Sequence, residues 1–473
     1  MKTLPLEIWS NILHAVPKKD LRRCLGVCSL WHDFGIKLVF HTIHLYFGSW
    51  PEECGNDVQT FVRRSQEMLT YISSKPSESF ASTVENIVVH GRRNYSNSSA
   101  QATLSTALKG LPQLLSFEWH SEWHFSWDWP WFPDEILNVL CTSCPQLRHL
   151  GLPTLAAGLV YDAFKQLRSI SVTSSDVHLS SKEFLSVANS DTFHRTGLHR
   201  LQLSHWSLAE ASGVGSPFIH LRELVFISTD ECDSEDLELI LKHTARLESL
   251  ELHQLGGLDI CSLLGNLVQN LPSLTSLMLS GNIFEPYPDG FELVRAFIES
   301  HSYMKRLCIK IPIEWKYIDV FMPAIHGMTQ LEALGLMGMN LDSNTKIIPS
   351  LSKDFASAIE SIPRSLQALA LGTMLSSYEG LIHDLSAFPS LGFLLMLKMF
   401  EDSDPASLPS PQILVDKIPH LTMVGSRDDI CNVTHGSNGK RDLVCWTELI
   451  KKRTRVADDL DMAHAAWLLY SHD

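Results

Sequence analysis

A spaced apolar pattern recurs along most of this 473-residue chain and constrains its fold more than any other feature. The pattern is L-x-x-L-x-L, with a large apolar residue at each of the three fixed places. Successive copies start 20 to 35 residues apart, about 28 on average, and the last copy is partial. A period of this length predicts stacked structural repeats rather than separate globular domains. The first places are Val84, Leu114, Leu147, Leu167, Leu198, Leu221, Leu247, Leu274, Met304, Leu331, Leu366, Leu391 and Leu421.

The residues around each copy indicate which elements the repeat contains. Proline lies two residues before the first place in five copies, for example at Pro112 and Pro272, and there it ends a helix and favours an extended segment. Apolar residues at helical spacing come before several of these prolines, as with Leu263, Leu264 and Leu267. Each unit is therefore predicted to be a short strand, a loop and an amphipathic helix. Because neither element can bury its apolar face alone, neighbouring units must stack into one continuous core.

This repeat resembles the leucine-rich-repeat family. The resemblance implies an α/β solenoid with a parallel sheet on its concave face and helices on its convex face. The family's asparagine, five residues after the second leucine, appears only as Asn282. We therefore expect the turns to satisfy their backbone groups in other ways.

The first forty residues predict three short helices, which carry more apolar surface than so short a segment can bury. Pro5 suits the first turn of the first helix, and Asp20 is a good cap for the second. Some of the apolar surface must therefore pack on the first repeats or remain available to a partner. One reading is a lid for the solenoid, and the other is a docking module.

Three linked submotifs favour the docking module: residues 4–8 (Leu-Pro-Leu-Glu-Ile), residues 17–21 (Pro-Lys-Lys-Asp-Leu) and residues 27–31 (Val-Cys-Ser-Leu-Trp). They resemble the F-box motif over residues 2 to about 45. The resemblance implies hydrophobic docking on a Skp-type adaptor that bridges to a cullin. Val16 replaces the usual leucine, and Gly26 is expected inside the second helix, where it would cost about 1 kcal/mol relative to alanine. The adaptor-binding residues that the resemblance implies are Leu4, Pro5, Ile8, Ile12, Leu21, Val27, Cys28 and Trp31.

The chain therefore divides into an F-box at 1–45, a linker or cap helix at 46–83, irregular repeats at 84–426 and a C-terminal cap or tail at 427–473. The combination implies a non-catalytic substrate-recognition subunit of a Skp–cullin–F-box ubiquitin ligase, which holds an unidentified protein target on its repeats. The alternative is a non-catalytic interaction scaffold that is not linked to degradation.

Side chains two, four and six residues after each first place alternate away from the core and face the concave side. In the later copies this stripe turns apolar, as at Ala333, Ala370 and Leu395. Such a stripe is expected to be covered, either by a target or by part of residues 427–473. The candidate target-binding residues on this face are Arg200, Gln202, Glu223, Glu251, His253, Met278, Arg306, Lys310, Met337 and Phe393.

Composition narrows the partners and the compartment. The chain has 38 Lys and Arg against 53 Asp and Glu, so its net charge of −15 argues against nucleic acid and anionic membranes as partners. Its most apolar run, residues 391–400, is too short to span a bilayer. The ten cysteines are scattered, which is typical of a reducing compartment. We expect a cytosolic or nuclear protein.

No motif for a cofactor, a metal or catalysis is visible in the sequence. Cys141 and Cys144 form a lone C-x-x-C, and because a structural metal site needs four ligands, both are expected to be core thiols. Five tryptophans between Trp119 and Trp131 form an aromatic cluster. It could anchor a partner segment, or it could be an insertion that folds back onto the solenoid.

Overall fold

The computed structural model describes most of the repeat region and the main elements on either side of it. The described residues are 9, 12–13, 16, 21, 23–48, 56–74, 78–92, 98–122, 132–153, 163–172, 197–204, 216–227, 234–253, 260–280, 288–311, 318–338, 359, 362–372, 378–397, 408–426, 429–435, 440–446 and 463–470.

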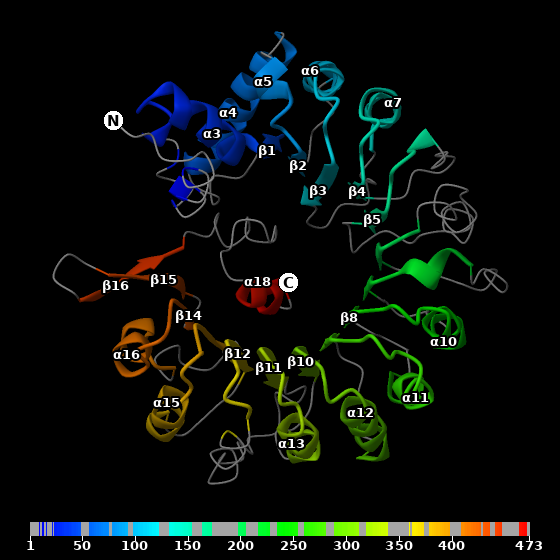
Figure 1. The fold of residues 1–473 in the computed structure, drawn as a ribbon, viewed down its shortest axis with the longest axis vertical. Helices are drawn as coiled ribbons and strands as arrows, with labels where there is room; N and C mark the ends of the chain where they lie inside the picture. The colour runs from blue at the N-terminus through cyan, green and yellow to red at the C-terminus, as the bar shows by residue number, and fades with distance from the viewer. Residues whose placement is uncertain are drawn as a thin grey trace. The chain divides into compact units, whose positions relative to one another are not determined.

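The protein is a mixed α/β chain built on a long, mostly parallel sheet of 16 strands, ordered β1 to β16 as in the sequence (Figure 1). Its residues fall into two compact units, unit 1 at Met1–Ser204 and unit 2 at His205–Asp473. Strands β1 to β6 lie in unit 1 and strands β7 to β16 in unit 2. The predicted α/β solenoid with a parallel sheet is confirmed.

Unit 1 alternates strands with helices. Its strands are β1 (Thr42–Phe47), β2 (Asn86–Arg92), β3 (Ser116–Glu122), β4 (His149–Leu152), β5 (Ser169–Val172) and β6 (Arg200–Ser204). Its helices are α3 (Ser29–Phe40), α4 (Asn56–Ser73), α5 (Glu78–Ala81), α6 (Ser98–Lys109) and α7 (Asp134–Ser143).

Unit 2 continues the same alternation and then departs from it after β14. Its strands are β7 (Glu223–Ile227), β8 (Ser249–His253), β9 (Ser276–Ser280), β10 (Arg306–Ile311), β11 (Ala333–Gly338), β12 (Ala368–Gly372), β13 (Phe393–Leu397), β14 (Met423–Ser426), β15 (Asp429–His435) and β16 (Arg441–Cys445). Its helices are η3 (Ser216–His220), α10 (Ser234–Lys242), α11 (Ile260–Asn266), α12 (Pro288–Ser300), α13 (Ile318–His326), α15 (Glu379–Ser386), α16 (Pro411–Lys417) and α18 (Ala463–Tyr470).

The apolar pattern sets the register of the sheet. Strands β2 to β14 each begin two residues after a predicted first place, for example β3 after Leu114 and β9 after Leu274. None of the thirteen first-place side chains is more than 2% exposed. The pairing keeps this alignment from copy to copy, so that Arg306 faces Ser276 on one side and Ala333 on the other. The first places predicted from the sequence are confirmed.

Main-chain hydrogen bonds tie each copy to the next. The backbone N–H groups of Leu115 and Ser116 both donate to the carbonyl of Glu85, at 2.7 and 3.0 Å. The same pair recurs where Lys305 and Arg306 donate to Thr275, at 2.8 and 3.1 Å. The starts of these strands thus satisfy their backbone groups through the neighbouring copy. The expectation for the turns that follow the strands, where the family's asparagine lies, stays a prediction, because most of those turns lie outside the described residues.

One strand was missed from the sequence. Strand β1 pairs in parallel with β2, with Thr42 opposite Asn86, and the N–H groups of Glu85 and Asn86 donate to the carbonyl of His41. It spans the division expected at residues 45 and 46. The repeat pattern is also present at Phe40, Ile43 and Leu45. These residues were assigned to the F-box, because the resemblance to that motif extends to about residue 45.

The predicted helices lie on one face of the strands (Figure 1). Most of the apolar residues expected on these helices are buried, such as Leu263, Leu264 and Leu267, whereas Leu293 on α12 is 41% exposed. Its side chain covers Gly265 of α11, where an added Cβ would lie 3.2 Å from the Leu293 Cδ2 atom. Across the part of the chain that the structure describes, no helix is long and apolar enough to cross a membrane.

The parallel order ends with a hairpin. Strand β15 runs antiparallel to β14, and β16 runs antiparallel to β15. Cys431 and Cys445 face each other on this hairpin and form a disulfide with the sulfurs 2.06 Å apart. Disulfides are typical of oxidising compartments, whereas the scattered cysteines indicated a reducing one. The compartment stays a prediction.

Arg441 joins the hairpin to the preceding repeat. Its guanidinium donates to the carbonyls of Val415 at 2.6 Å and Ile418 at 3.0 Å, and also to that of Leu421. We expect Arg441→Ala to lower the free energy of unfolding by about 2–3 kcal/mol, because three carbonyls lose a charged donor. Arg441→Lys should recover only part of this, because lysine lacks the planar fork. Urea unfolding measures both changes.

The control is Arg64→Ala, on the exposed side of α4. It should change the free energy of unfolding by less than about 0.5 kcal/mol. Equal losses in the Arg441→Ala and Arg64→Ala variants would contradict the bridging role of Arg441.

Candidate functional site

The described part of the F-box region exposes apolar side chains. Ile12 is 38% exposed, Val27 is 62% exposed, and Cys28 is also exposed. Leu21 is buried, while Trp31 on α3 is half-buried and packs edge-on against Trp9 at 5.5 Å between ring centroids. Leu4, Pro5 and Ile8 lie outside the described residues. Ile12, Val27 and Cys28 are thus accessible, whereas Leu21 belongs to the local core. The role of all these residues in adaptor binding stays a prediction.

The predicted three-helix arrangement of this region rests on one fully described helix, α3, so it stays a prediction. Gly26 differs from the expectation: it lies in a turn, where its N–H donates to the carbonyl of Arg23 at 3.3 Å. A glycine in a turn carries no helix penalty. The departure from the motif at this position is therefore not destabilising.

In unit 2, helix α18 covers the apolar part of the concave face, which we define as the face opposite the helices α10 to α16 (Figure 1). Ala465, Trp467 and Leu468 of α18 are buried in one cluster with side chains from the strands. The strand members include the apolar stripe expected from the sequence, and they are Met278, Cys308, Ala333, Met337, Ala368, Ala370, Phe393, Leu395 and Met423. Of the two predicted coverings, a target or the C-terminal segment, the structure shows the segment.

Three polar contacts orient α18 on this face. The indole Nε1 of Trp467 donates to Glu251 Oε1 at 3.0 Å, across 216 residues of sequence. The guanidinium of Arg306 lies over the Trp467 ring, 5.2 Å from its centroid, as in a cation–π contact. At the start of the helix, His464 Nε2 is 3.2 Å from Glu332 Oε2.

The predicted target-binding residues therefore fall into two groups. Met278, Met337 and Phe393 are buried in the α18 cluster, and Glu251 and Arg306 contact Trp467. Of the others, Glu223 and Arg200 are exposed, while Gln202, His253 and Lys310 are half-buried. Their role in target binding stays a prediction, and for the first group it requires α18 to move.

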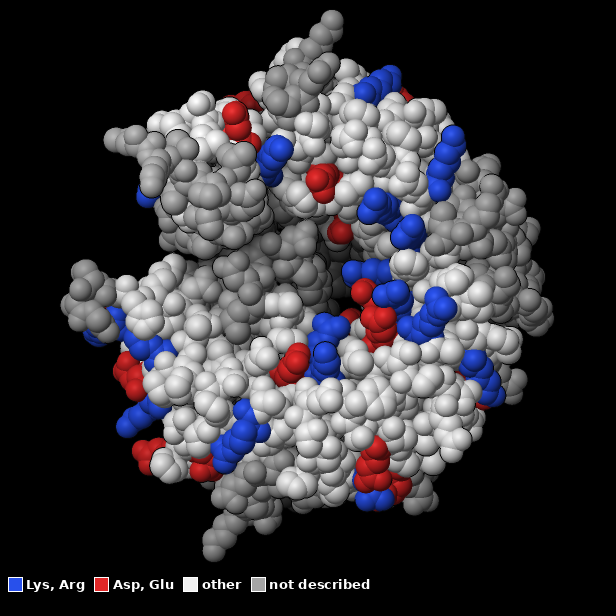
Figure 2. Space-filling model, viewed as in Figure 1, with Lys and Arg blue, Asp and Glu red and all other residues white. Residues whose placement is uncertain are grey.

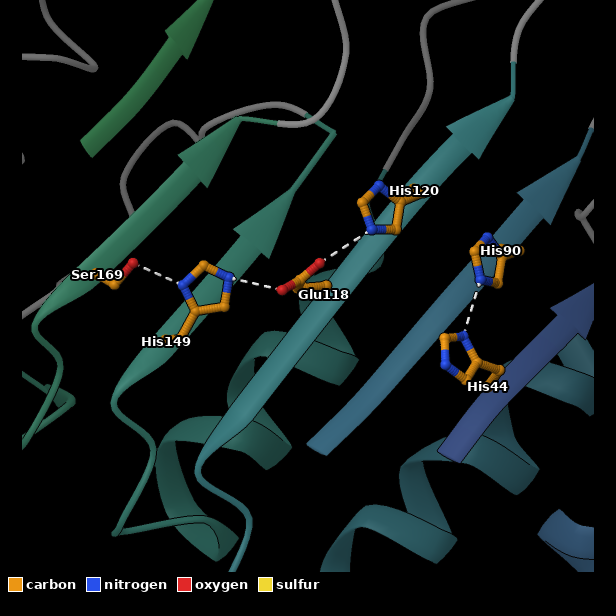
Figure 3. Close-up of polar contacts among 6 residues, drawn as sticks. All are labelled: His44, His90, Glu118, His120, His149 and Ser169. Atoms are coloured by element: carbon orange, nitrogen blue, oxygen red, sulfur yellow. Dashed lines mark hydrogen bonds and ion pairs between the residues drawn. The ribbon is translucent and has the colours of Figure 1, made fainter. Parts of the chain in front are cut away.

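The concave face of unit 1 carries a polar network that spans five strands (Figure 3). We call it the histidine network, and its members are His44, His90, Glu118, His120, His149 and Ser169. His44 Nδ1 lies 3.3 Å from His90 Nε2, and the rings of His90 and His120 stack at 5.6 Å. Ring stacking joins β2 to β3 in the middle of the network.

Glu118 connects the second half of the network. His120 Nε2 lies 3.0 Å from Glu118 Oε2, and His149 Nε2 lies 3.1 Å from Glu118 Oε1. His149 Nδ1 is 2.6 Å from the hydroxyl of Ser169. Burial raises the pKa of Glu118, but hydrogen bonds and charge from His120 and His149 outweigh it, so the pKa lies well below 4.5. The carboxylate is therefore ionised near neutral pH.

The histidine network was not predicted from the sequence. The rule used there, that side chains two, four and six residues after a first place face away from the core, would have located it. Glu118 and His120 lie four and six residues after Leu114, and His149 lies two after Leu147. Our candidates began at Arg200 because the earlier copies are less regular.

Ser169, His149 and Glu118 follow the order of an acyl-transfer triad, but their surroundings do not support that chemistry. The backbone N–H groups of Arg168 and Ser169 both donate to the carbonyl of Arg148, at 2.8 and 3.0 Å. These groups next to the hydroxyl are therefore engaged and cannot stabilise an oxyanion. The network offers donors and acceptors for binding.

The lone C-x-x-C pair and the tryptophan cluster were also singled out from the sequence. Cys144 is buried, as expected for a core thiol, whereas Cys141 is half-buried. Burial raises the pKa of Cys141 to about 11 and of Cys144 to about 12. Trp119 is buried edge-on against Phe132 at 5.2 Å between centroids, so it belongs to the core. The other tryptophans of the cluster, at 123, 127, 129 and 131, lie outside the described residues.

Surface charge is mixed. Figure 2 shows basic and acidic side chains interspersed on the face in view, in keeping with pairs such as Arg222 and Glu248 at 3.3 Å. Within the described ranges, no group of three or more His, Cys, Asp or Glu side chains is arranged to hold a metal ion.

The charge of Glu118 makes the stability of unit 1 depend on pH. Because its pKa is lower in the folded than in the unfolded chain, its stabilisation is present above about pH 4.5 and is lost as the pH falls through the folded pKa. We expect Glu118→Gln to lower the free energy of unfolding by about 1–2 kcal/mol at pH 7. The difference from the wild type should shrink below pH 4.5, as measured by thermal unfolding.

Glu85→Gln is the matched control, because Glu85 also pairs with a histidine, His41, at 3.2 Å but is 40% exposed. Exposed ion pairs contribute little, so this change should be near neutral. A gap between wild type and Glu118→Gln that stays constant down to pH 3 would contradict the assignment.

The docking of α18 should weaken in mild acid. Burial lowers the pKa of His464 below its ordinary 6.5; Glu332 opposes the shift, and Arg306 and Lys305 add to it. The undocked helix therefore binds the proton more readily, and docking is lost as the pH falls below 6.5. Hydrogen exchange over residues 463–470, corrected for intrinsic rates, should be faster at pH 5.5 than at pH 7.5. His464→Asn should remove most of that dependence, and equal pH dependence in both proteins would contradict it.

Comparison with known proteins gives one family match and several similar solved structures. Residues 1–45 match the family model described as F-box-like. No curated protein matches the chain. Among solved structures, a Bacteroides fragilis protein is 14% identical at a TM-score of 0.34, over 56% of this chain and 72% of that chain. The leucine-rich repeat-containing protein LegL7 from Legionella pneumophila is 14% identical at a TM-score of 0.28, over 85% of this chain and 92% of that chain.

These TM-scores are too low to support an argument, so the fold rests on the strand register described above. The chain carries an F-box-like domain at residues 1–45, and its parallel repeats are consistent with an F-box protein of the leucine-rich-repeat type.

Proposed function

We propose that this chain is the substrate-recognition subunit of a Skp–cullin–F-box ubiquitin ligase. The observation that carries the proposal is the F-box-like match over residues 1–45, within which Ile12 and Val27 are exposed. The F-box-like domain would bind a Skp-type adaptor, and the adaptor would bridge to a cullin. The repeats would hold a protein target.

In this role the chain makes and breaks no bonds. It raises the local concentration of target lysines near the ubiquitin-charged enzyme, so its contribution to the reaction is proximity. Side chains of the concave face supply the target contacts, and both units provide candidates: Arg200 and Gln202 in unit 1, and Glu223 and Lys310 in unit 2. We place the activity in the cytosol or nucleus, on the basis of the scattered cysteines.

A second candidate is a non-catalytic interaction scaffold that is not linked to degradation. The observation that favours it is α18, which occupies the apolar concave surface of unit 2 where a target would otherwise sit. Co-purification separates the two functions, because a scaffold need not bring a cullin with it.

Adaptor binding is tested with the double variant Ile12→Asp and Val27→Asp. Because both side chains are exposed, the variant should fold normally, while a buried charge opposes the hydrophobic contact with the adaptor. We expect its affinity for a purified Skp-type adaptor to fall at least about 100-fold, as measured by isothermal titration calorimetry.

Ile413→Asp is the control, because Ile413 on α16 is comparably exposed but lies far along the sequence from residues 1–45. It should bind the adaptor like the wild type. A folded wild-type chain that binds neither adaptor nor adaptor–cullin complex would contradict the ligase role. Binding of the adaptor without any cullin would support the scaffold.

A further inference from the structure

We propose that the concave face of strands β8 to β13 is a receptor for a short helix, and that α18 is its intramolecular occupant. The external ligand would be a helical segment of the target that carries a tryptophan followed by a leucine, as Trp467 and Leu468 do. The proposal specifies the class of target that the repeats would bind. It rests on the proposed ligase function only for the ubiquitination that would follow binding.

The floor of the receptor has the shape that a helix requires. Cys308, Gly335 and Ala370 lie side by side in one row across β10, β11 and β12. A Cβ atom added at Gly335 would lie 3.1 Å from Leu468 Cδ2 and 2.6 Å from Cys308 Sγ. A side chain at this position would therefore require Cys308 to shift and would press on Leu468 of the helix. Larger buried side chains, Met278 and Leu395, lie on strands to either side of this row.

The contacts also carry the polar signature of recognition. Trp467 and Arg306 are residue types enriched at binding hot spots. Here the guanidinium of Arg306 lies over the Trp467 ring, and the carboxylate of Glu251 accepts from the indole N–H. A purely structural plug could bury aliphatic side chains without these charges, which are costly to desolvate. Near the start of the helix, Glu332 provides a third charged contact, with His464.

The occupant is a separable element. Its eight residues are too few for a stable helix in isolation, so its helical form depends on the receptor. An intramolecular ligand acts at an effective concentration on the order of millimolar. An external helix therefore binds well only after the hold of α18 has been weakened.

The test uses the full chain and a fluorescent peptide with the sequence of residues 458–473 as the probe. The wild type should bind this peptide weakly. Trp467→Ala loosens α18 and should raise the peptide affinity at least about tenfold in fluorescence anisotropy. The same peptide with alanine in place of its tryptophan should not bind. If folded Trp467→Ala protein binds the peptide no better than the wild type does, α18 is a structural cap and the proposal fails.

If Trp467→Ala does not fold, a second variant in which a disulfide holds α18 on the receptor tests the proposal. Cys308 Sγ and Leu468 Cδ2 both lie near the Gly335 position, which makes Leu468→Cys the choice for a disulfide with Cys308. Titration of free thiols after oxidation selects the cross-linked chain for the measurement. The oxidised chain should reject the peptide and the reduced chain should bind it, whereas the Cys308→Ser, Leu468→Cys double variant should ignore the oxidant. Equal binding by the oxidised and reduced chains, or none by either, overturns the proposal.

Two further measurements distinguish this proposal from a dimer and from a failure of the proposed ligase function. Light scattering of the wild type across a concentration series should show a monomer. A dimer that the Trp467→Ala change dissociates would mean that α18 occupies the receptor of a second copy, which overturns intramolecular occupancy. Adaptor affinity is measured on the same samples. Peptide binding without adaptor binding would preserve the receptor and contradict the ligase role, whereas the reverse would preserve the ligase role and contradict the receptor.

Discussion

The rest of the structure depends on one shared hydrogen-bond acceptor. From β1 to β6 and from β7 to β14, the carbonyl that follows the first apolar residue of a repeat accepts two N–H groups from the next repeat, as Glu85 does from Leu115 and Ser116. This contact fixes which residues of neighbouring strands face each other, and therefore which side chains share a face. The core, the concave surface and the seat of α18 all follow from that register.

The same register gives the two units different concave surfaces. Glu118 and His120 in unit 1 occupy the same repeat places as Glu251 and His253 in unit 2, four and six residues after a first place. In unit 1 the second carboxylate oxygen meets His149, and the network stays within the strands. In unit 2 the corresponding oxygen accepts from Trp467, so a recurrent polar pair has been used to hold a helix. Local chemistry, rather than a change of fold, distinguishes the two surfaces.

The fold could be predicted largely from the sequence because burial of the first-place residues, such as Leu114 and Leu274, is a local and periodic requirement. Strand β1 was missed because residues near Phe40 form both the end of α3 and the start of a repeat. The F-box motif accounted for these residues, so the repeat pattern was not sought there. The Cys431–Cys445 pair and the contact between Trp467 and Glu251 join residues whose spacing carries no signal. Coverage of the apolar stripe was predicted from its exposure, with part of residues 427–473 as one of two alternatives, but the polar contacts that orient α18 were not.

The antiparallel hairpin at β15 and β16 bears on how the length of such an array is set. A parallel repeat presents its successor with the same acceptor that it used itself, so stacking alone has no natural end. The reversal at β15 replaces that acceptor row with an antiparallel edge, on which another strand–helix unit of this kind would find no matching partner. Whole repeats could therefore be gained or lost between β2 and β13 during evolution. The binding surface would change in extent while the adaptor module and the terminating hairpin kept their form.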